Sequence, residues 1–167
     1  CNWAYAEYSI AGTDYTSYVG LKRAVVQKGE NGDTTGVDWA DCSGASYCND
    51  CETGGNNALN SVAIAFVLSI PITIISFIRT SNARDLNLYK VLIIIFGFLS
   101  LLLFMIAMGS FGSACYDNLP SGDDYAYGPG FNSIATCFVF EIFILVLHLL
   151  TPVKKSGDAP ADNYTSA

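Results

Sequence analysis

Two kinds of side chain in this sequence could do chemistry: ionisable groups within an apolar run, and a set of cysteines. Glu141 and His148 are the ionisable residues between Phe131 and Leu150. An ionised carboxylate in such surroundings is costly, so we expect Glu141 to be neutral and to donate a hydrogen bond to an adjacent helix. The candidate acceptors are Ser69, Thr73 or a group on a helix that would precede Cys1. The functional alternative for Glu141 is a proton or cation site, or a ligand to a pigment. Steps of three and four residues place part of this run on one helical face, which should turn toward neighbouring helices: Ser133, Cys137, Glu141, Ile144 and His148.

The cysteines outside the apolar runs are predicted to form structural disulfides. The candidates are Cys1, Cys42, Cys48, Cys51 and Cys115. In an oxidising compartment such thiols pair and stabilise a small domain. Spacing alone does not fix the pairing, and the odd cysteine could pair with Cys137 or with a partner chain. The run from Cys42 to Cys51 could alternatively ligate zinc, but no histidine supports that interpretation, so we predict no metal and no cofactor.

The composition indicates that these residues belong to a membrane protein. Hydrophobic residues make up 51% of the 167 residues and charged residues only 14%, whereas a soluble domain has about a quarter charged residues. Three apolar runs, at residues 58–78, 91–111 and 131–152, have the length of about 20 residues that crosses a membrane. Too little polar sequence remains to cover three buried helices in a soluble core. We therefore expect an α-helical transmembrane bundle, and the net charge of −7 excludes a nucleic-acid partner.

The basic residues predict the orientation of the bundle. They lie between the first two apolar runs and after the third, whereas the connection between the second and third runs holds no Lys or Arg. By the positive-inside rule, residues 79–90 and the tail 153–167 are cytosolic, and residues 1–57 and 112–130 are extracellular or lumenal. We expect a multi-pass integral protein of the plasma membrane. Asn163, a potential glycosylation acceptor, should stay unmodified in the cytosolic tail.

Residues 1–57 are predicted to form a small antiparallel sheet that disulfides hold together. β-branched and aromatic residues favour strands over Trp3–Ile10 and Tyr15–Val26. The pair Asn31-Gly32 favours a hairpin turn before a returning strand over Thr34–Trp39. The polar, Gly-rich residues 44–57 then lead to the first span.

The first span also carries a face of small residues. Residues that recur every four positions, and so form this helix-packing face, are Ser61, Ala65, Ser69 and Thr73. Small side chains let helix backbones approach closely, which matters because lipid gives helices no hydrophobic drive to associate. The sequence contains no phosphate-binding loop, nucleophile elbow or metalloprotease motif, so we do not expect an enzyme.

Short motifs in this chain resemble those of the claudin superfamily. The matching residues are Trp3, Gly20, Leu21, Gly128 and Gly130. The first three are similar to the start of the W…GLW…C…C signature on the extracellular sheet of claudins, and the glycines are similar to residues that lead into the fourth helix. Lys22 stands where the second signature Trp would be, and Ala24 stands near the first signature Cys. The wider group includes peripheral-myelin-type proteins, calcium-channel γ subunits and fungal eisosome-type tetraspans.

The resemblance implies both an architecture and a function. A further helix before Cys1 would give four spans with both termini cytosolic; the alternative is three spans with an external N-terminus. We expect a non-enzymatic accessory or assembly subunit of a larger membrane complex, acting through its ectodomain and helix faces. One alternative is a cell–cell adhesion or barrier protein that self-associates through the ectodomain, and another is a proton- or cation-coupled transporter that uses Glu141. The expected partners are other membrane proteins or a second copy, in lateral or trans contact, and the lipid bilayer.

Overall fold

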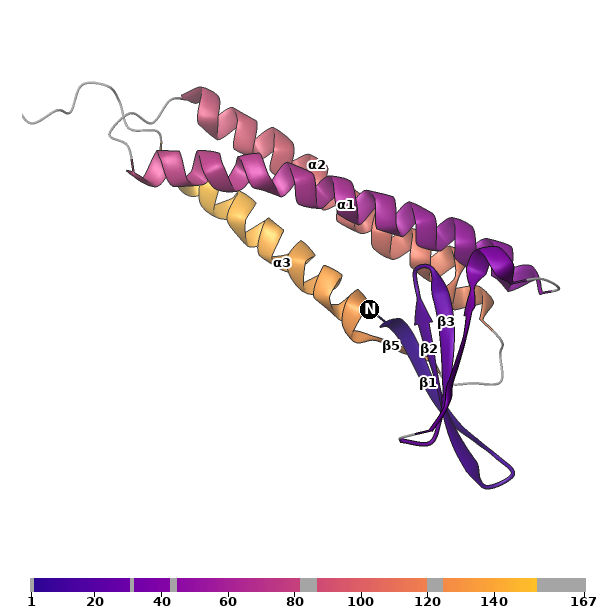
Figure 1. Ribbon diagram of the computed structural model, residues 1–167. Helices are drawn as coiled ribbons and strands as arrows, with labels where there is room; N and C mark the ends of the chain where they lie inside the picture. The colour runs from indigo at the N-terminus through magenta and orange to yellow at the C-terminus, as the bar shows by residue number, and fades with distance from the viewer. Residues whose placement is uncertain (1, 31, 43–44, 82–86, 120–124, 153–167) are drawn as a thin grey trace, which may run out of the picture.

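The computed structural model describes residues 2–30, 32–42, 45–81, 87–119 and 125–152. Within them, a small antiparallel sheet lies at one end of three long helices (Figure 1). The strands are β1 (Asn2–Ile10), β2 (Thr13–Gly20), β3 (Arg23–Lys28), β4 (Thr34–Asp38) and β5 (Ala126–Tyr127). The helices are α1 (Ser46–Ser81), α2 (Asn87–Ala114) and α3 (Pro129–Leu150), and two short 3-10 turns cover Trp39–Asp41 and Tyr116–Asn118.

The sheet has the strand order β4-β3-β2-β1-β5, and all its pairings are antiparallel. The β1–β2 hairpin turns at Ala11 and Gly12, whose φ angles are 52° and 80°. Positive φ at both central residues is the geometry of a type I′ turn, which matches the natural twist of paired strands. β4 returns along β3, as the sequence predicted, while Asn31 of the expected turn lies outside the described residues.

The predicted strand over Tyr15–Val26 is wrong, because this segment forms two strands, β2 and β3, joined by a tight turn at Leu21 and Lys22. Trp39, which follows this turn by 17 residues in the sequence, stabilises it through two hydrogen bonds. Trp39 donates its backbone N–H to the Lys22 carbonyl at 2.9 Å and its indole Nε1–H to the Gly20 carbonyl at 3.0 Å. Local strand propensity favours a continuous strand here, and the tertiary contact with Trp39 overrides it.

All three helices are long and apolar enough to cross a membrane. α1 begins at Ser46, so the polar residues expected to be a connection before Ala58 are helical. At 1.5 Å per residue this adds about 18 Å of helix beside the sheet. Gly54 and Gly55 lie in this part of α1, where a Cβ on Gly54 would lie 2.7 Å from the Ser110 carbonyl oxygen of α2. Glycine weakens a helix on its own, but here it permits close packing.

α2 is the central helix of the bundle. It packs along α1 and against α3 (Figure 1), whereas α3 contacts α1 through hydrogen bonds at the end far from the sheet. One buried stripe runs the length of α2, through Ile93, Gly97, Ser100, Phe104, Ala107 and Phe111. Large apolar side chains cover the outside of all three helices, among them Phe66, Ile95 and Phe143. A wide exposed apolar surface of this kind suits contact with lipid.

Candidate functional site

The sheet and the adjoining helix ends share one hydrophobic core. Its buried members come from β1, β2, the Trp39 turn, α1 and α2, and they include Trp3, Val19, Trp39, Ala58 and Phe111. Partly buried side chains from the start of α3 pack against the same core. Because strands and helices bury the same side chains, the sheet is fixed relative to the helices, not attached through a flexible linker.

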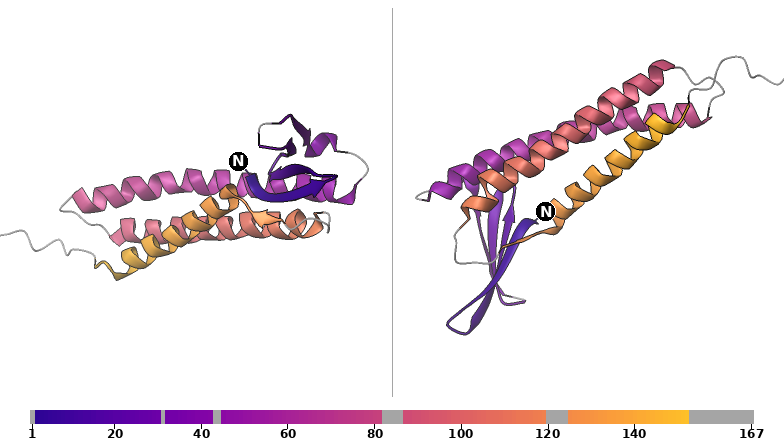
Figure 2. Two further views of the ribbon diagram at one scale, coloured as in Figure 1. Left: turned by 90° about the horizontal axis from the view of Figure 1, so that it is seen from below. Right: turned by 180° about the vertical axis from the view of Figure 1, so that it is seen from behind.

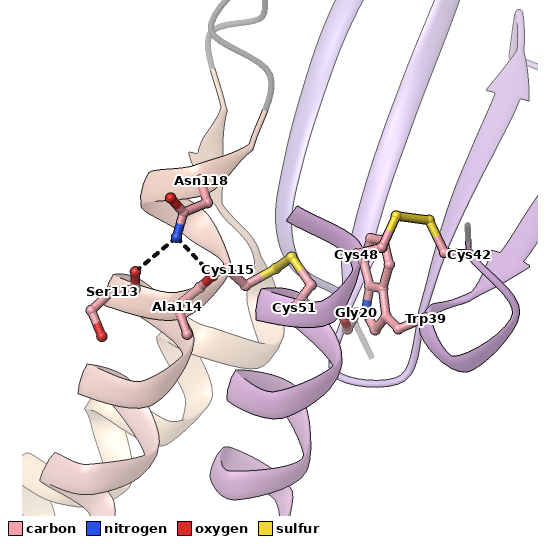
Figure 3. The surroundings of a disulfide bond; sticks show 9 residues. All are labelled: Gly20, Trp39, Cys42, Cys48, Cys51, Ser113, Ala114, Cys115 and Asn118. Carbon is pink, nitrogen blue, oxygen red and sulfur yellow. Dashed lines mark hydrogen bonds between the residues drawn. A yellow bond between two sulfur atoms is a disulfide. The ribbon is translucent and has the colours of Figure 1, made fainter. Parts of the chain in front are cut away.

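Two disulfides reinforce this junction (Figure 3). Cys51 of α1 is bonded to Cys115 at the end of α2, and Cys42 is bonded to Cys48 at the start of α1. Cys51 and Cys115 are fully buried in the shared core. The predicted disulfides are therefore present, and the bonded thiols leave the zinc alternative without ligands. Cys1 lies outside the described residues.

The residues that carry the claudin resemblance lie together around β1. The Trp3 ring contacts Phe111 and Phe131 edge-on, with ring centroids 5.0 and 5.9 Å apart. The Gly128 backbone N–H donates to the Trp3 carbonyl at 2.7 Å, and a Cβ on Gly128 would lie 2.6 Å from the Asn2 carbonyl oxygen. Only glycine fits such a close approach of two backbones. Gly130 is buried at the start of α3.

Leu21 and Gly20 position the sheet on α1. A Cβ on Gly55 of α1 would overlap the Leu21 carbonyl oxygen, so the β2–β3 turn rests directly on the helix backbone. Lys22, where the resemblance places a Trp, donates from its ammonium to the Asn56 side-chain oxygen of α1. Trp39, which the sequence analysis did not single out, holds the same turn from the other side. This role of Trp39 can be found only from the tertiary structure, because Trp39 lies 17 or more residues beyond that turn in the sequence.

A tyrosine cluster closes the start of α3. The Tyr127 ring stacks on Tyr116 at 4.4 Å and on Phe131 at 4.1 Å, between ring centroids. Burial in this stack raises the pKa of the Tyr127 phenol, and the neighbouring Tyr116 and Asp117 raise it further. The Tyr116 hydroxyl donates to the Tyr125 carbonyl. The cluster joins the connection after α2 to the last helix.

The distal part of the sheet carries an open, polar groove of about 580 Å³. Its lining includes Glu7, Asp14 and Glu30, together with Tyr15 and Tyr18. This groove lies on the part of the sheet that projects beyond the helices (Figure 2). Acidic and tyrosine side chains on a rigid surface can contact another protein through hydrogen bonds and ring packing.

Glu141 is buried between α3 and α2. Its side chain is 8% exposed, and a Cβ on Gly97 would lie 3.4 Å from its Oε1 atom. Neither Glu141 Oε1 nor the buried Ser100 hydroxyl of α2 has a hydrogen-bond partner among the described residues. Two of the expected acceptors are not used: the Ser69 hydroxyl donates to the Phe66 carbonyl at 2.7 Å and the Thr73 hydroxyl donates to the Ser69 carbonyl at 2.8 Å, both within α1.

Helix rotation differs from the faces proposed from spacing. In α1, Ser61 and Ala65 are buried and Ser69 is half-buried, but Thr73 is exposed and Ile72 takes the buried position. In α3 the buried positions are Gly130, Glu141 and Leu145, with His148 half-buried. The other members of the proposed α3 face, Ser133, Cys137 and Ile144, are exposed. In α1 the buried positions Ala58, Ser61, Ala65 and Ile72 follow the helical repeat of about 3.6 residues, from which a constant step of four departs after two turns.

The opposite end of the bundle holds a polar contact between α1 and α3. His148 Nε2 lies 3.0 Å from the Ser76 hydroxyl, and His148 Nδ1 lies 3.1 Å from Nη1 of Arg79. At the same end, the Lys90 ammonium of α2 donates to the carbonyls of Leu149 and Thr151 at 3.0 and 3.1 Å. Glu141 and His148 of α3 therefore lie apart, with His148 at the helix end and Glu141 two turns before it.

The described residues contain no group of three or more His, Cys, Asp or Glu side chains that could hold a metal ion. No protein-family model matches the chain, and no curated protein matches it either.

Proposed function

We propose that this protein is a non-enzymatic, claudin-like tetraspan that serves as an accessory or assembly subunit of a larger membrane complex. The observation that carries the proposal is the shared core of sheet and helix ends, reinforced by the Cys51–Cys115 disulfide. It fixes the outer surface of the sheet relative to the exposed faces of the helices. A partner can therefore contact both surfaces at once without ordering a linker, and so without that entropic cost.

The proposed topology has four spans in the plasma membrane, with the sheet and its disulfides outside. Disulfides persist in an extracellular or lumenal compartment, which supports this orientation. The start of β1 lies beside the start of α3 (Figure 1). A helix preceding β1 would therefore reach the sheet close to the level at which α3 begins.

Purification in a mild detergent followed by mass spectrometry tests the proposal. An accessory subunit should co-purify with a different membrane protein in a fixed ratio. Glu7→Lys, in the groove of the sheet, should reduce this recovery if the ectodomain makes the contact, whereas Lys28→Glu changes charge by the same amount outside the residues that line the groove. Recovery of this chain alone or only with copies of itself would contradict the proposal.

Adhesion through the ectodomain is the second candidate function. The observation in its favour is β4, an edge strand in which every residue, Thr34 to Asp38, is exposed. An exposed edge strand can pair with a strand of another chain. An adhesion protein should concentrate at cell–cell contacts and self-associate between membranes, and Val37→Pro in β4 should abolish both. An accessory subunit should show neither behaviour.

A further inference from the structure

β4 is an open edge strand of the sheet. The order β4-β3-β2-β1-β5 gives β4 one neighbouring strand, and all five of its residues are exposed. Such an edge presents backbone N–H and C=O groups that can pair with a further strand. The register of β4 on β3 decides which residues offer these groups.

Hydrogen bonds at both ends of β4 establish this register. Trp39 donates its backbone N–H to the Lys22 carbonyl at 2.9 Å, and Lys28 donates its backbone N–H to the Asp33 carbonyl at 3.2 Å. In an antiparallel pair, the backbone groups of every second residue point toward the neighbouring strand. The odd-numbered residues from 33 to 39 therefore point these groups toward β3. The residues of β4 that point them to the open edge are Thr34, Gly36 and Asp38.

An apolar groove lies along one face of β3 and β4. It has a volume of about 400 Å³, and its lining includes Val19, Ala24, Val26, Val37 and Trp39. Val19, Ala24 and Val37 are direct cross-strand neighbours, so they lie on the same face of the sheet. Val19 belongs to the core that the sheet shares with the helices, whereas Val37 is 44% exposed. The groove therefore continues this core to the open edge.

A segment that adds to β4 as a strand can use both the edge and the groove. Side chains alternate between the two faces of a strand, and paired strands keep the same alternation. Residues of the added strand opposite Thr35 and Val37 would therefore point to the face that holds the groove. This mode of binding combines main-chain hydrogen bonds with pockets for alternate side chains. The groove accordingly requires an extended segment with a large apolar side chain at one of these positions.

The charge around the edge favours a basic segment over a second copy of β4. Residues 30–41 contain four side-chain carboxylates and no Lys or Arg. Arg23 of β3 lies 3.8 Å from Asp38, but both side chains are more than half exposed, so this pair contributes little. Two copies of β4 paired antiparallel about Gly36 would bring Asp38 of one copy next to Asp33 of the other, where like charges repel. Lys or Arg at the ends of a segment would instead meet opposite charges.

We propose that β4 receives an extended, basic segment of the partner membrane protein as a sixth strand, with a large apolar side chain of that segment in the groove. This inference rests on the proposed accessory role and names the kind of segment that the partner contributes. The polar groove around Glu7 lies on the opposite face of the sheet, because Glu7 and Val26 are out of step in the strand register. The two surfaces can therefore be tested separately.

Synthetic peptides test the β4 site on the full chain in lipid nanodiscs. The probe is a labelled peptide, Lys-Thr-Phe-Thr-Val-Thr-Lys, with acetylated and amidated ends, and its binding is measured by fluorescence anisotropy. We expect saturable binding that weakens about tenfold when Ala replaces the Phe of the peptide. Replacing both Lys residues of the peptide by Glu should weaken binding further. A peptide with the sequence of residues 33–39, which represents a second copy of β4, should bind more weakly than the probe.

Methylation of the peptide backbone shows whether the peptide binds as a strand. When Phe and Val point to the groove, the Thr residues of the peptide direct their backbone N–H groups toward β4. Methylating the Thr nitrogens keeps every side chain and should abolish binding. Methylating the Phe and Val nitrogens, which point away from β4, is the matched control and should leave binding unchanged.

Gly36 offers a matched pair of variants on the protein side. Its N–H points to the open edge, so Gly36→Pro removes a donor to the added strand and none from the pairing with β3. Gly36→Ala keeps this N–H, and its Cβ would first meet the end of the flexible Arg23 side chain, at 2.6 Å. Gly36→Pro should abolish peptide binding, and Gly36→Ala should keep most of it. Tryptophan fluorescence during denaturant unfolding shows whether both variants are folded, and the peptide comparisons decide the question without any variant.

Co-purification in mild detergent separates this proposal from the accessory role. The partner that co-purifies with wild type should be lost with Gly36→Pro and kept with Gly36→Ala. Equal recovery of the partner with both variants would overturn the β4 site while the accessory role stands, whereas recovery of no partner with wild type would contradict the accessory role itself. Equal binding of the two methylated peptides, or tighter binding of the Glu-ended peptide or of the peptide of residues 33–39 than of the probe, would also overturn the site.

Discussion

Opening the Cys51–Cys115 disulfide should destabilise the ectodomain more than opening the Cys42–Cys48 disulfide. The bonded cysteines are 64 residues apart in the first case and 6 in the second. The chain-entropy relation gives about 4 kcal/mol for the long loop and about 2 kcal/mol for the short one. Both are upper values, because helices that stay inserted in the membrane restrict the unfolded loop as well. The Cys51–Cys115 disulfide is also fully buried in the shared core, so replacing both of its cysteines by alanine removes packed atoms.

Tryptophan fluorescence is a suitable assay for this comparison. The chain has two tryptophans, and both Trp3 and Trp39 are buried in the shared core. Denaturant unfolding in detergent micelles, followed by fluorescence, should show a larger loss of stability for the paired substitution Cys51→Ala and Cys115→Ala than for Cys42→Ala and Cys48→Ala. An equal or larger loss of stability for Cys42→Ala and Cys48→Ala would refute the view that the Cys51–Cys115 disulfide holds the sheet and the helices together.

Three further predictions concern local features of the structure. Glu141→Leu should leave the free energy of unfolding in detergent within about 1 kcal/mol of wild type, since Glu141 Oε1 has no partner to lose among the described residues. A larger loss of stability would show that Glu141 has such a partner. Loss of a measured ion flux in Glu141→Gln would favour transport. Gly55→Ala should cost about 1–3 kcal/mol in the fluorescence assay because its Cβ meets the backbone of the β2–β3 turn. Gly112→Ala, where a Cβ meets nothing within 4 Å, should be neutral or stabilising, and equal effects would contradict this packing. Trp39→Phe should cost about 1 kcal/mol for the lost indole hydrogen bond, read from Trp3 fluorescence, and an unchanged midpoint would show that this bond contributes nothing.

Much of the architecture could be predicted from the sequence because it depends on local composition. The length and hydropathy of the three runs suffice for three helices that could cross a membrane, and the cysteines outside them indicate disulfides. The β2–β3 turn could not be predicted, because Trp39 holds it from outside the segment. The helical start of α1 was missed for a related reason: Gly54 and Gly55 disfavour a helix locally and become useful only against α2 and the turn.

The surroundings of Glu141 could not be predicted from the residue pattern of α3 alone. Spacing predicted that the residue faces other helices, and the structure buries it. Its neighbours depend on the rotation of α2, which presents Gly97, and of α1, where Ser69 and Thr73 hydrogen-bond to their own backbone. Both hydroxyls can satisfy themselves within one helical turn, so they do not need a partner on another helix.

A single substitution tests the orientation of the sheet relative to the membrane. Ala11 lies at the tip of the β1–β2 hairpin, is exposed, and has a φ of 52°, which asparagine tolerates better than alanine. Because Gly12 and Thr13 follow, Ala11→Asn completes a glycosylation acceptor. Expressed in a eukaryotic host, this variant should gain one glycan that an endoglycosidase removes, while Asn163 of the tail stays unmodified. An unmodified hairpin together with a glycan on Asn163 would show that the sheet faces the cytosol.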